Sequence, residues 1–167
     1  MSVQELTHES LSFSYDFLNE SDYKSWSISS VNQGFPYEYF FYTNKDIYRP
    51  WEDFSLIRKQ LSEQWTESVQ QLEVVFSNRE KNKIQPNMLK AITLFLSLLY
   101  WSNQLPVNLK DFPNKIKDLK GKPVNVEERL SFVLSRPNFY PSYMQIKSLM
   151  DEQFKIAAKM DALKKLK

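Results

Sequence analysis

The chain has 167 residues, of which 42% are hydrophobic and 15% aromatic, and its formal net charge is +2. This size and composition are typical of one soluble globular domain whose core is rich in large rings. The sequence contains one histidine, two glycines and no cysteine, which excludes disulfides, thiolate zinc sites and cysteine nucleophiles, and leaves His8 as the sole imidazole base. Gly34 and Gly121 stand far apart, which excludes a glycine-rich phosphate loop.

The cellular location of the protein is inferred mainly from targeting signals that the sequence lacks. Residues 1–10 carry Glu5 and Glu9 and lack the basic and apolar regions of a signal peptide. The most apolar run, residues 91–101, is shorter than the roughly 20 residues that a membrane helix needs. We therefore expect a cytoplasmic protein that does not associate with a membrane, and the lack of cysteine is compatible with that compartment.

Charge divides the chain into three parts. Residues 1–49 carry three basic and seven acidic side chains, residues 50–107 carry six of each, and residues 108–167 carry thirteen basic and seven acidic ones. We expect an acidic, aromatic arm over residues 1–49 and a helical domain over residues 50–167. The basic C-terminal part could meet an anionic partner, or the acidic arm and the basic body could simply attract each other.

Large apolar residues, mostly aromatic, recur at every second position in two stretches of the arm, at Leu11, Phe13, Tyr15 and Phe17 and at Phe35, Tyr37, Tyr39 and Phe41. Alternation of this kind predicts a short two-stranded element or an extended arm lying over the helices. Residues 19–34 are rich in Ser, Asn and Asp and predict a loop.

Two long helices are predicted next. Apolar residues recur at steps of three and four from Phe54 to Phe76, which predicts an amphipathic helix that starts at Pro50 and stops in the polar segment 78–83. A second helix is predicted from Pro86 to about Trp101. It is apolar on nearly all sides, so it belongs at the centre of a bundle.

The C-terminal part predicts shorter elements and one more long helix. Pro113 favours a turn followed by a short helix over 113–119. Asn125 with Glu128, and Ser142 with Gln145, are capping-box pairs that predict a helix from Asn125 to about Ser135 and another from Ser142. The last apolar stripe fails after Met160, so the final residues are predicted to fray. The expected fold is all-α, a single bundle of about five helices with an extended N-terminal arm that could be partly β.

Several short strings of the sequence resemble a known family. These are Trp101-Ser102-Asn103, Pro106-Val107, the run Lys122 to Leu130, Arg136-Pro137 and Tyr140. They are similar to the YpoC-like proteins, small uncharacterised helical proteins of low-GC Gram-positive bacteria, over roughly residues 35–155. The resemblance implies no assigned activity, catalytic residue or cofactor. Genes of that family lie near those for replication initiation and base-excision repair, which implies nucleic-acid metabolism as a context only.

No catalytic or metal-binding constellation is evident in the sequence, and no cofactor is expected. His8 lies in a polar N-terminal stretch without a partner nucleophile. The carboxylate pairs 52–53, 127–128 and 151–152 diverge by about 100° when they lie on a helix, so no pair forms a site by itself. A metal-dependent phosphodiesterase is therefore the weakest of three hypotheses, and a non-enzymatic protein is favoured.

The leading hypothesis is a protein–protein interaction module whose partner the sequence does not identify. Its candidate contacts are aromatic and polar residues beside predicted turns: Trp101, Asn103, Pro106, Arg129, Phe139 and Tyr140. The same aromatics could instead seal the core, and Arg129 is more readily explained by pairing with a carboxylate.

The alternative hypothesis is an accessory nucleic-acid-binding protein. Its candidate residues are lysines of the last helix and its end: Lys147, Lys155, Lys159, Lys164, Lys165 and Lys167. Asp151 shares the face of Lys147 and Lys155, and such alternation of sign is typical of a solvated, salt-bridged surface rather than of a DNA-binding face.

Overall fold

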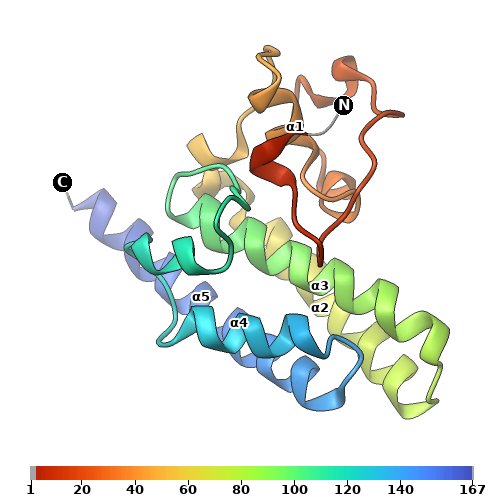
Figure 1. The fold of residues 1–167 in the computed structure, drawn as a ribbon. Coiled ribbons are helices and arrows are strands. Elements are labelled where there is room, and N and C mark those ends of the chain that lie inside the picture. Colours follow the sequence, from red (N-terminus) through yellow and green to blue (C-terminus); the bar gives the residue numbers. More distant parts are fainter. Residues whose placement is uncertain (1–2, 167) are drawn as a thin grey trace.

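The computed structural model describes residues 3–166, and within this range the chain is all-α, as the sequence predicted. Its α-helices are α1 (Pro36–Tyr42), α2 (Phe54–Ser77), α3 (Lys81–Ser102), α4 (Val126–Ser135) and α5 (Tyr140–Lys165). Short 3-10 helices connect them. In Figure 1 the N-terminal segment covers one side of α3, while α4 and α5 lie on the other side and α2 runs beside α3.

The helices α2 and α3 form an antiparallel pair at the centre of the fold. The predicted stripe of α2 is buried from Phe54 to Val75. The helix starts later than predicted, because Pro50–Glu52 forms a separate 3-10 turn and Asp53 has a φ of −121° that interrupts the helical path. All side chains of α3 from Ala91 to Ser102 are buried, which confirms its central place.

Helix α3 begins at Lys81, so the prediction that Pro86 opens it is wrong. Pro86 lies inside the helix. A proline at this position cannot donate a hydrogen bond to the carbonyl of Asn82, but both residues are exposed, so water can take the place of the missing amide. Pro86 is the sixth residue of the helix, so the hydrogen bond that it removes lies near the exposed N-terminal end and the later turns are unaffected.

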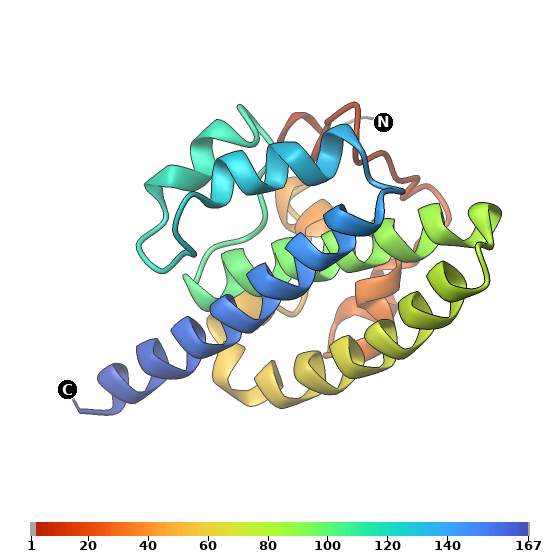
Figure 2. The same ribbon diagram turned by 90° about the horizontal axis from the view of Figure 1, so that it is seen from below.

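Helices α4 and α5 form a second antiparallel pair, of which α5 packs on α3 (Figure 2). Neither predicted capping box forms. Asn125 precedes α4 with a left-handed φ of 57° and makes no side-chain cap, whereas a capping residue is normally extended. Ser142 lies inside α5, which starts at Tyr140, and its hydroxyl donates to the carbonyl of Arg136 at 2.7 Å.

The predicted fraying after Met160 is also wrong, since α5 continues to Lys165. Asp161 is half-buried. Its carboxylate accepts a hydrogen bond from Arg58 of α2 at 2.8 Å, and this ion pair holds the last turns of α5 to the start of α2.

The N-terminal segment contains no strand within residues 3–49, so the prediction of β structure is wrong. An isolated bridge joins His8 and Leu11. The residues from Pro36 to Tyr42 form α1 instead. Almost every position of this run is aromatic, so its pattern fits a helical period as well as the two-residue period of a strand, and Pro36 at the first helical position favours the helix.

The N-terminal segment nevertheless shares the core of the helices. Leu11 and Tyr37 are fully buried and belong to the same hydrophobic cluster as α3 and α5. The amide of Leu109 donates to the carbonyl of Glu5 at 2.6 Å, and the hydroxyl of Tyr42 donates to the carbonyl of Val107 at 3.0 Å. These contacts fix the segment against the connection between α3 and α4.

Candidate functional site

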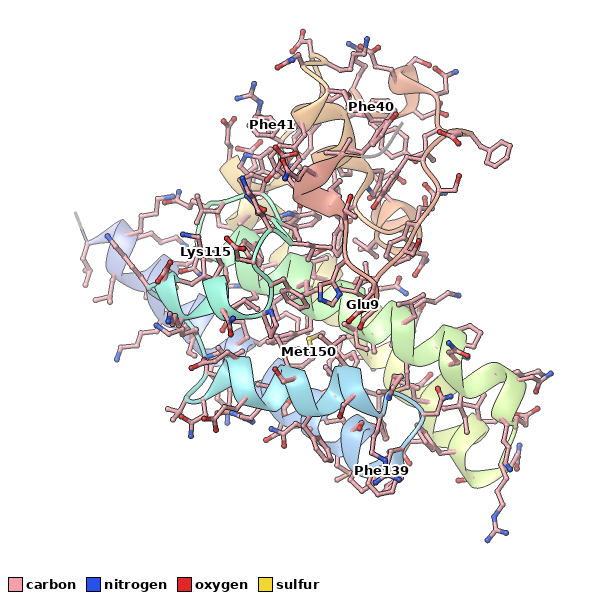
Figure 3. All side chains as sticks on the ribbon, in the orientation of Figure 1. Glu9, Phe40, Phe41, Lys115, Phe139 and Met150 are labelled. Carbon is pink, nitrogen blue, oxygen red and sulfur yellow. The ribbon has the colours of Figure 1, made fainter. Side chains whose placement is uncertain are left out.

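Aromatic side chains gather where the chain turns from α4 into α5. Phe132 lies on α4, Phe139 precedes α5, Tyr140 is its first residue and Met144 follows one turn later. Each of these four side chains keeps between 37% and 46% of its surface exposed. Together with Arg136 they are named here the aromatic surface, and Figure 3 shows Phe139 at this turn.

The turn that carries the aromatic surface is braced by local contacts. The ring centroids of Phe132 and Phe139 lie 6.5 Å apart. The guanidinium of Arg136 lies 4.0 Å from the centroid of Phe139, in cation–π geometry. The carbonyl of Arg136 accepts hydrogen bonds from the amide of Phe139 and from the hydroxyl of Ser142. The exposed rings are thereby held in one arrangement.

A buried layer supports Tyr140 from below. Its ring contacts Phe76 edge to face, and Phe76 stacks on Tyr143 with a centroid distance of 5.4 Å. The buried hydroxyl of Tyr143 donates to Glu73 at 2.8 Å. Burial, and then the hydrogen bond to Glu73, raise the pKa of Tyr143, so the phenol stays a neutral donor. Lys147 lies over the Tyr143 ring and 3.6 Å from Glu73.

Arg129 joins α4 to α5 rather than facing outward. Its guanidinium donates to both carboxylate oxygens of Glu152 and to the carbonyl of Val124. The hydrogen bond from Arg129 lowers the pKa of Glu152 below its ordinary value. Pairing with a carboxylate, one of the two roles expected for Arg129, is thus what the structure describes.

Trp101, Asn103 and Pro106 lie around the C-terminal end of α3. Trp101 is 2% exposed, and its indole N–H donates to Glu38 at 2.7 Å. The side-chain amide of Asn103 exchanges two hydrogen bonds of 2.8 Å with the backbone of Gly121. Pro106 is half-buried beside a surface hollow. Trp101 and Asn103 therefore hold segments together here.

The six predicted partner contacts do not form one surface. Ser102 at the end of α3 accepts a hydrogen bond from Gln153 of α5, thirteen residues after Tyr140. At 1.5 Å per residue this places the two groups about 20 Å apart along α5. Phe139 and Tyr140 belong to the aromatic surface, whereas Trp101, Asn103 and Pro106 lie near the opposite end of α3.

A buried carboxyl that sequence reasoning missed lies under the N-terminal segment. Glu38 of α1 is fully buried, and its Oε2 accepts hydrogen bonds from the indole of Trp101 and, at 3.0 Å, from the amide of Val107. Its Oε1 has no hydrogen-bond partner among residues 3–166. Burial raises the pKa of Glu38 to about 7. The available signal was a single acid inside the aromatic run of residues 35–42.

The candidate lysines extend along α5 toward its free end, which projects beyond the other helices (Figure 2). Lys147 is engaged with Glu73. The remaining members that the structure describes are exposed, namely Lys155, Lys159, Lys164 and Lys165. Lys167 lies outside the described residues.

The described part of the chain offers neither a metal site nor a membrane span. Among residues 3–166 no group of three or more His, Cys, Asp or Glu side chains is arranged to hold a metal ion. None of the helices in the described range is both long and apolar enough to cross a membrane.

Comparison with known proteins identifies similar sequences. The sequence model of the YpoC-like protein family matches residues 56–165, from the first turn of α2 to the last residue of α5. The chain is 33% identical over 115 residues to the "Uncharacterized protein YpoC" of Bacillus subtilis (strain 168), which covers 68% of this chain and 70% of that protein. No solved structure matches.

Proposed function

We propose, from the premise that this chain belongs to the YpoC-like family, that it is a non-enzymatic module for protein–protein interaction in the cytoplasm. The matched segment contains α2 to α5 and therefore every residue of the aromatic surface. The family description names no activity, so the proposal is supported by this chain's own surface.

The aromatic surface is the observation that carries the proposal. Large rings, a flexible methionine and an arginine are the residue types enriched at protein interfaces. Here Phe132 and Phe139 are exposed beside one another, Arg136 stacks on Phe139, and the exposed Tyr140 follows Phe139 in the chain. The ring of Tyr140 contacts the stacked pair of Phe76 and Tyr143. A surface that is already ordered loses little conformational freedom when a partner binds.

The test compares partner capture by the native protein and by a variant of the aromatic surface. Phe139→Glu with Tyr140→Glu places two charges among the exposed rings, and Leu56→Glu is the matched control, because Leu56 is an exposed apolar residue on α2. Affinity capture from cell extract, with quantitative mass spectrometry, is expected to show a partner retained by the native and Leu56→Glu proteins and lost by the double variant. Equal retention by all three would contradict the proposal.

A second candidate function is the binding of nucleic acid by the projecting end of α5. It is favoured by the four exposed lysines Lys155, Lys159, Lys164 and Lys165. Fluorescence anisotropy of labelled oligonucleotides should then show binding at about 50 mM salt that falls by orders of magnitude at about 200 mM. Replacing the four lysines by alanine should weaken the binding further, and an absence of binding at low salt would contradict this second function.

The phosphodiesterase hypothesis has no supporting observation among residues 3–166.

A further inference from the structure

A hollow of about 330 Å³ lies between α1, the end of α3 and the connection that leads to α4. Its principal lining residues are Tyr42, Tyr100, Leu105, Pro106, Lys110 and Lys115. Hollows of similar volume occur elsewhere on the described surface, so size alone does not single this one out. It is near the lower end of ligand sites, roughly 300–1,000 Å³, and suits one large side chain rather than an extended cofactor.

The apolar wall of the hollow is fixed in place before any ligand binds. The hydroxyl of Tyr42 donates to the carbonyl of Val107, and the hydroxyl of Tyr100 donates to the carbonyl of Asn108, both at 3.0 Å. The two rings are thus attached to the connection that they face. Leu105, which lies beside them, is 47% exposed. An apolar side chain entering the hollow would cover Leu105 without first ordering the wall.

The rim of the hollow carries Lys110, Lys115 and Asp118, so positive charge exceeds negative charge there by one lysine. Lys110 and Lys115 are both exposed. Asp118 lies on the same rim and pairs with Lys115 at 3.6 Å, whereas Lys110 has no ion pair with any residue of the described range. Residues 108–122 carry five lysines against two aspartates. The rim therefore attracts negative charge on the ligand that enters.

We propose that this hollow binds an acidic peptide segment of a partner protein, which inserts one large apolar side chain between the two tyrosines. Its flanking carboxylates pair with Lys110 and compete with Asp118 for Lys115. Nucleic acid fits less well, because both tyrosine hydroxyls are already used and the side-chain oxygen of Asn108 already accepts from the amide of Lys110, which leaves few groups to recognise a base edge. The site is independent of the aromatic surface, which lies at the other end of α3.

The probe is a set of fluorescein-labelled peptides of about eight residues, in which acidic residues flank a central Phe, Trp, Leu or Met. Anisotropy with the full-length protein at about 50 mM salt should give a Kd of about 100 µM or tighter for at least one member. The same peptide with a central Ala, or with Lys in place of its acids, should bind at least tenfold more weakly.

Two pairs of variants locate the site. Leu105→Glu and Lys110→Glu should each weaken the best peptide by about tenfold or more. Their matched controls are Leu56→Glu and Lys159→Glu, which change an exposed leucine and an exposed lysine elsewhere and should leave the Kd unchanged. Circular dichroism of all four checks that they are folded.

The proposal is overturned if no peptide of the set binds, if the central Ala peptide binds equally well, or if the control variants weaken binding as much as the site variants. It is also overturned if a labelled single-stranded oligonucleotide competes for the hollow and loses affinity in Leu105→Glu, because the occupant would then be nucleic acid. Partner capture at the aromatic surface is tested with Phe139→Glu and Tyr140→Glu, whereas peptide binding to the hollow is tested with Leu105→Glu and Lys110→Glu. Either proposal can therefore be contradicted without the other.

Discussion

One cluster of aromatic side chains lies near the C-terminal end of α3, and another, built by residues of α2, α4 and α5, lies near its N-terminal end. The N-terminal segment of the chain covers the first cluster but not the second. At the C-terminal end Trp101 contacts Trp26, which stacks on Tyr37, and all three lie beneath or within residues 3–49. At the other end Phe76 and Tyr143 support the exposed ring of Tyr140. Figure 3 shows the separation, with Phe40 and Phe41 on one side and Phe139 far from them. The same residue types build core or surface according to what covers them.

At the covered end a buried hydrogen-bond donor needs an acceptor from the protein itself. The indole N–H of Trp101 is out of reach of water, and Glu38 accepts its hydrogen bond. The open end leaves its rings against solvent. Changes at the covered end should therefore cost folding stability, and changes at the open end should cost binding.

The largest expected effect is at the covered end. Trp101→Ala should lower the free energy of unfolding by about 3–5 kcal/mol, because it opens a cavity and removes a hydrogen bond from a buried carboxyl. Urea denaturation followed by circular dichroism measures this loss. Tyr140→Ala at the open end is the comparison, with an expected loss below about 1 kcal/mol. Equal losses would contradict the distinction between the two ends.

The next effect is a pH dependence that Glu38 contributes. Burial raises its pKa from 4.5 to about 7, so the folded protein holds this proton more tightly than the unfolded chain. The contribution to stability is complete below about pH 4.5 and is lost as the pH rises to about 7, by up to roughly 3 kcal/mol at 1.36 kcal/mol per pH unit.

Glu38→Gln isolates that contribution. The amide oxygen still accepts from Trp101 and Val107, but the side chain cannot ionise. Urea denaturation at about pH 5, 6, 7 and 8 should show the native protein losing stability more steeply than the variant. Identical pH profiles for the two proteins would show that Glu38 does not titrate in this range.

A smaller effect is expected in the layer beneath the aromatic surface. Tyr143→Phe keeps the ring stack with Phe76 and removes the hydroxyl that bonds Glu73, a side chain that solvent still reaches. The free energy of unfolding should fall by about 0.5–1.5 kcal/mol. Thermal denaturation measures it, and a loss of more than about 3 kcal/mol would place Glu73 in a structural role that its exposure does not suggest.

The smallest effect on stability is expected at the aromatic surface itself. Phe139→Ser should change the free energy of unfolding by less than about 1 kcal/mol, since more than a third of its ring is exposed. Chemical denaturation provides the measurement. A variant as unstable as Trp101→Ala would show that the exposed rings belong to the core. It would contradict the distinction between the covered end and the open end.

Long periodic patterns were predictable from the sequence because each of them is set by a repeating choice of side chains. The stripe of α2 and the all-apolar run of α3 identified the helices and the central place of α3. The first residues of the helices were less predictable. Asn125 and Ser142 have side chains that can cap a helix, but neither has the backbone conformation of a cap. The run around Phe35 misled because it is too uniformly aromatic to show one period.

Only part of the aromatic surface could be predicted from the sequence. Phe139 and Tyr140 were identified by their place beside a turn, but Phe132 lies next to Phe139 only because the chain turns back from α4 into α5. The pairing of Trp101 with Glu38 spans 63 positions of the chain. Contacts over such separations leave no spacing in the sequence to read.

The sequence by itself determined the all-α class, the amphipathic helices and the shortage of catalytic side chains, because composition and periodicity are local properties. The tertiary structure alone decided which aromatics are covered. That depends on where the N-terminal segment lies, and its position is fixed by contacts such as those of Glu38 with Trp101 and Val107. Burial is a property of neighbours in space, so the division of one set of rings into core and candidate interface emerges only when the chain is folded.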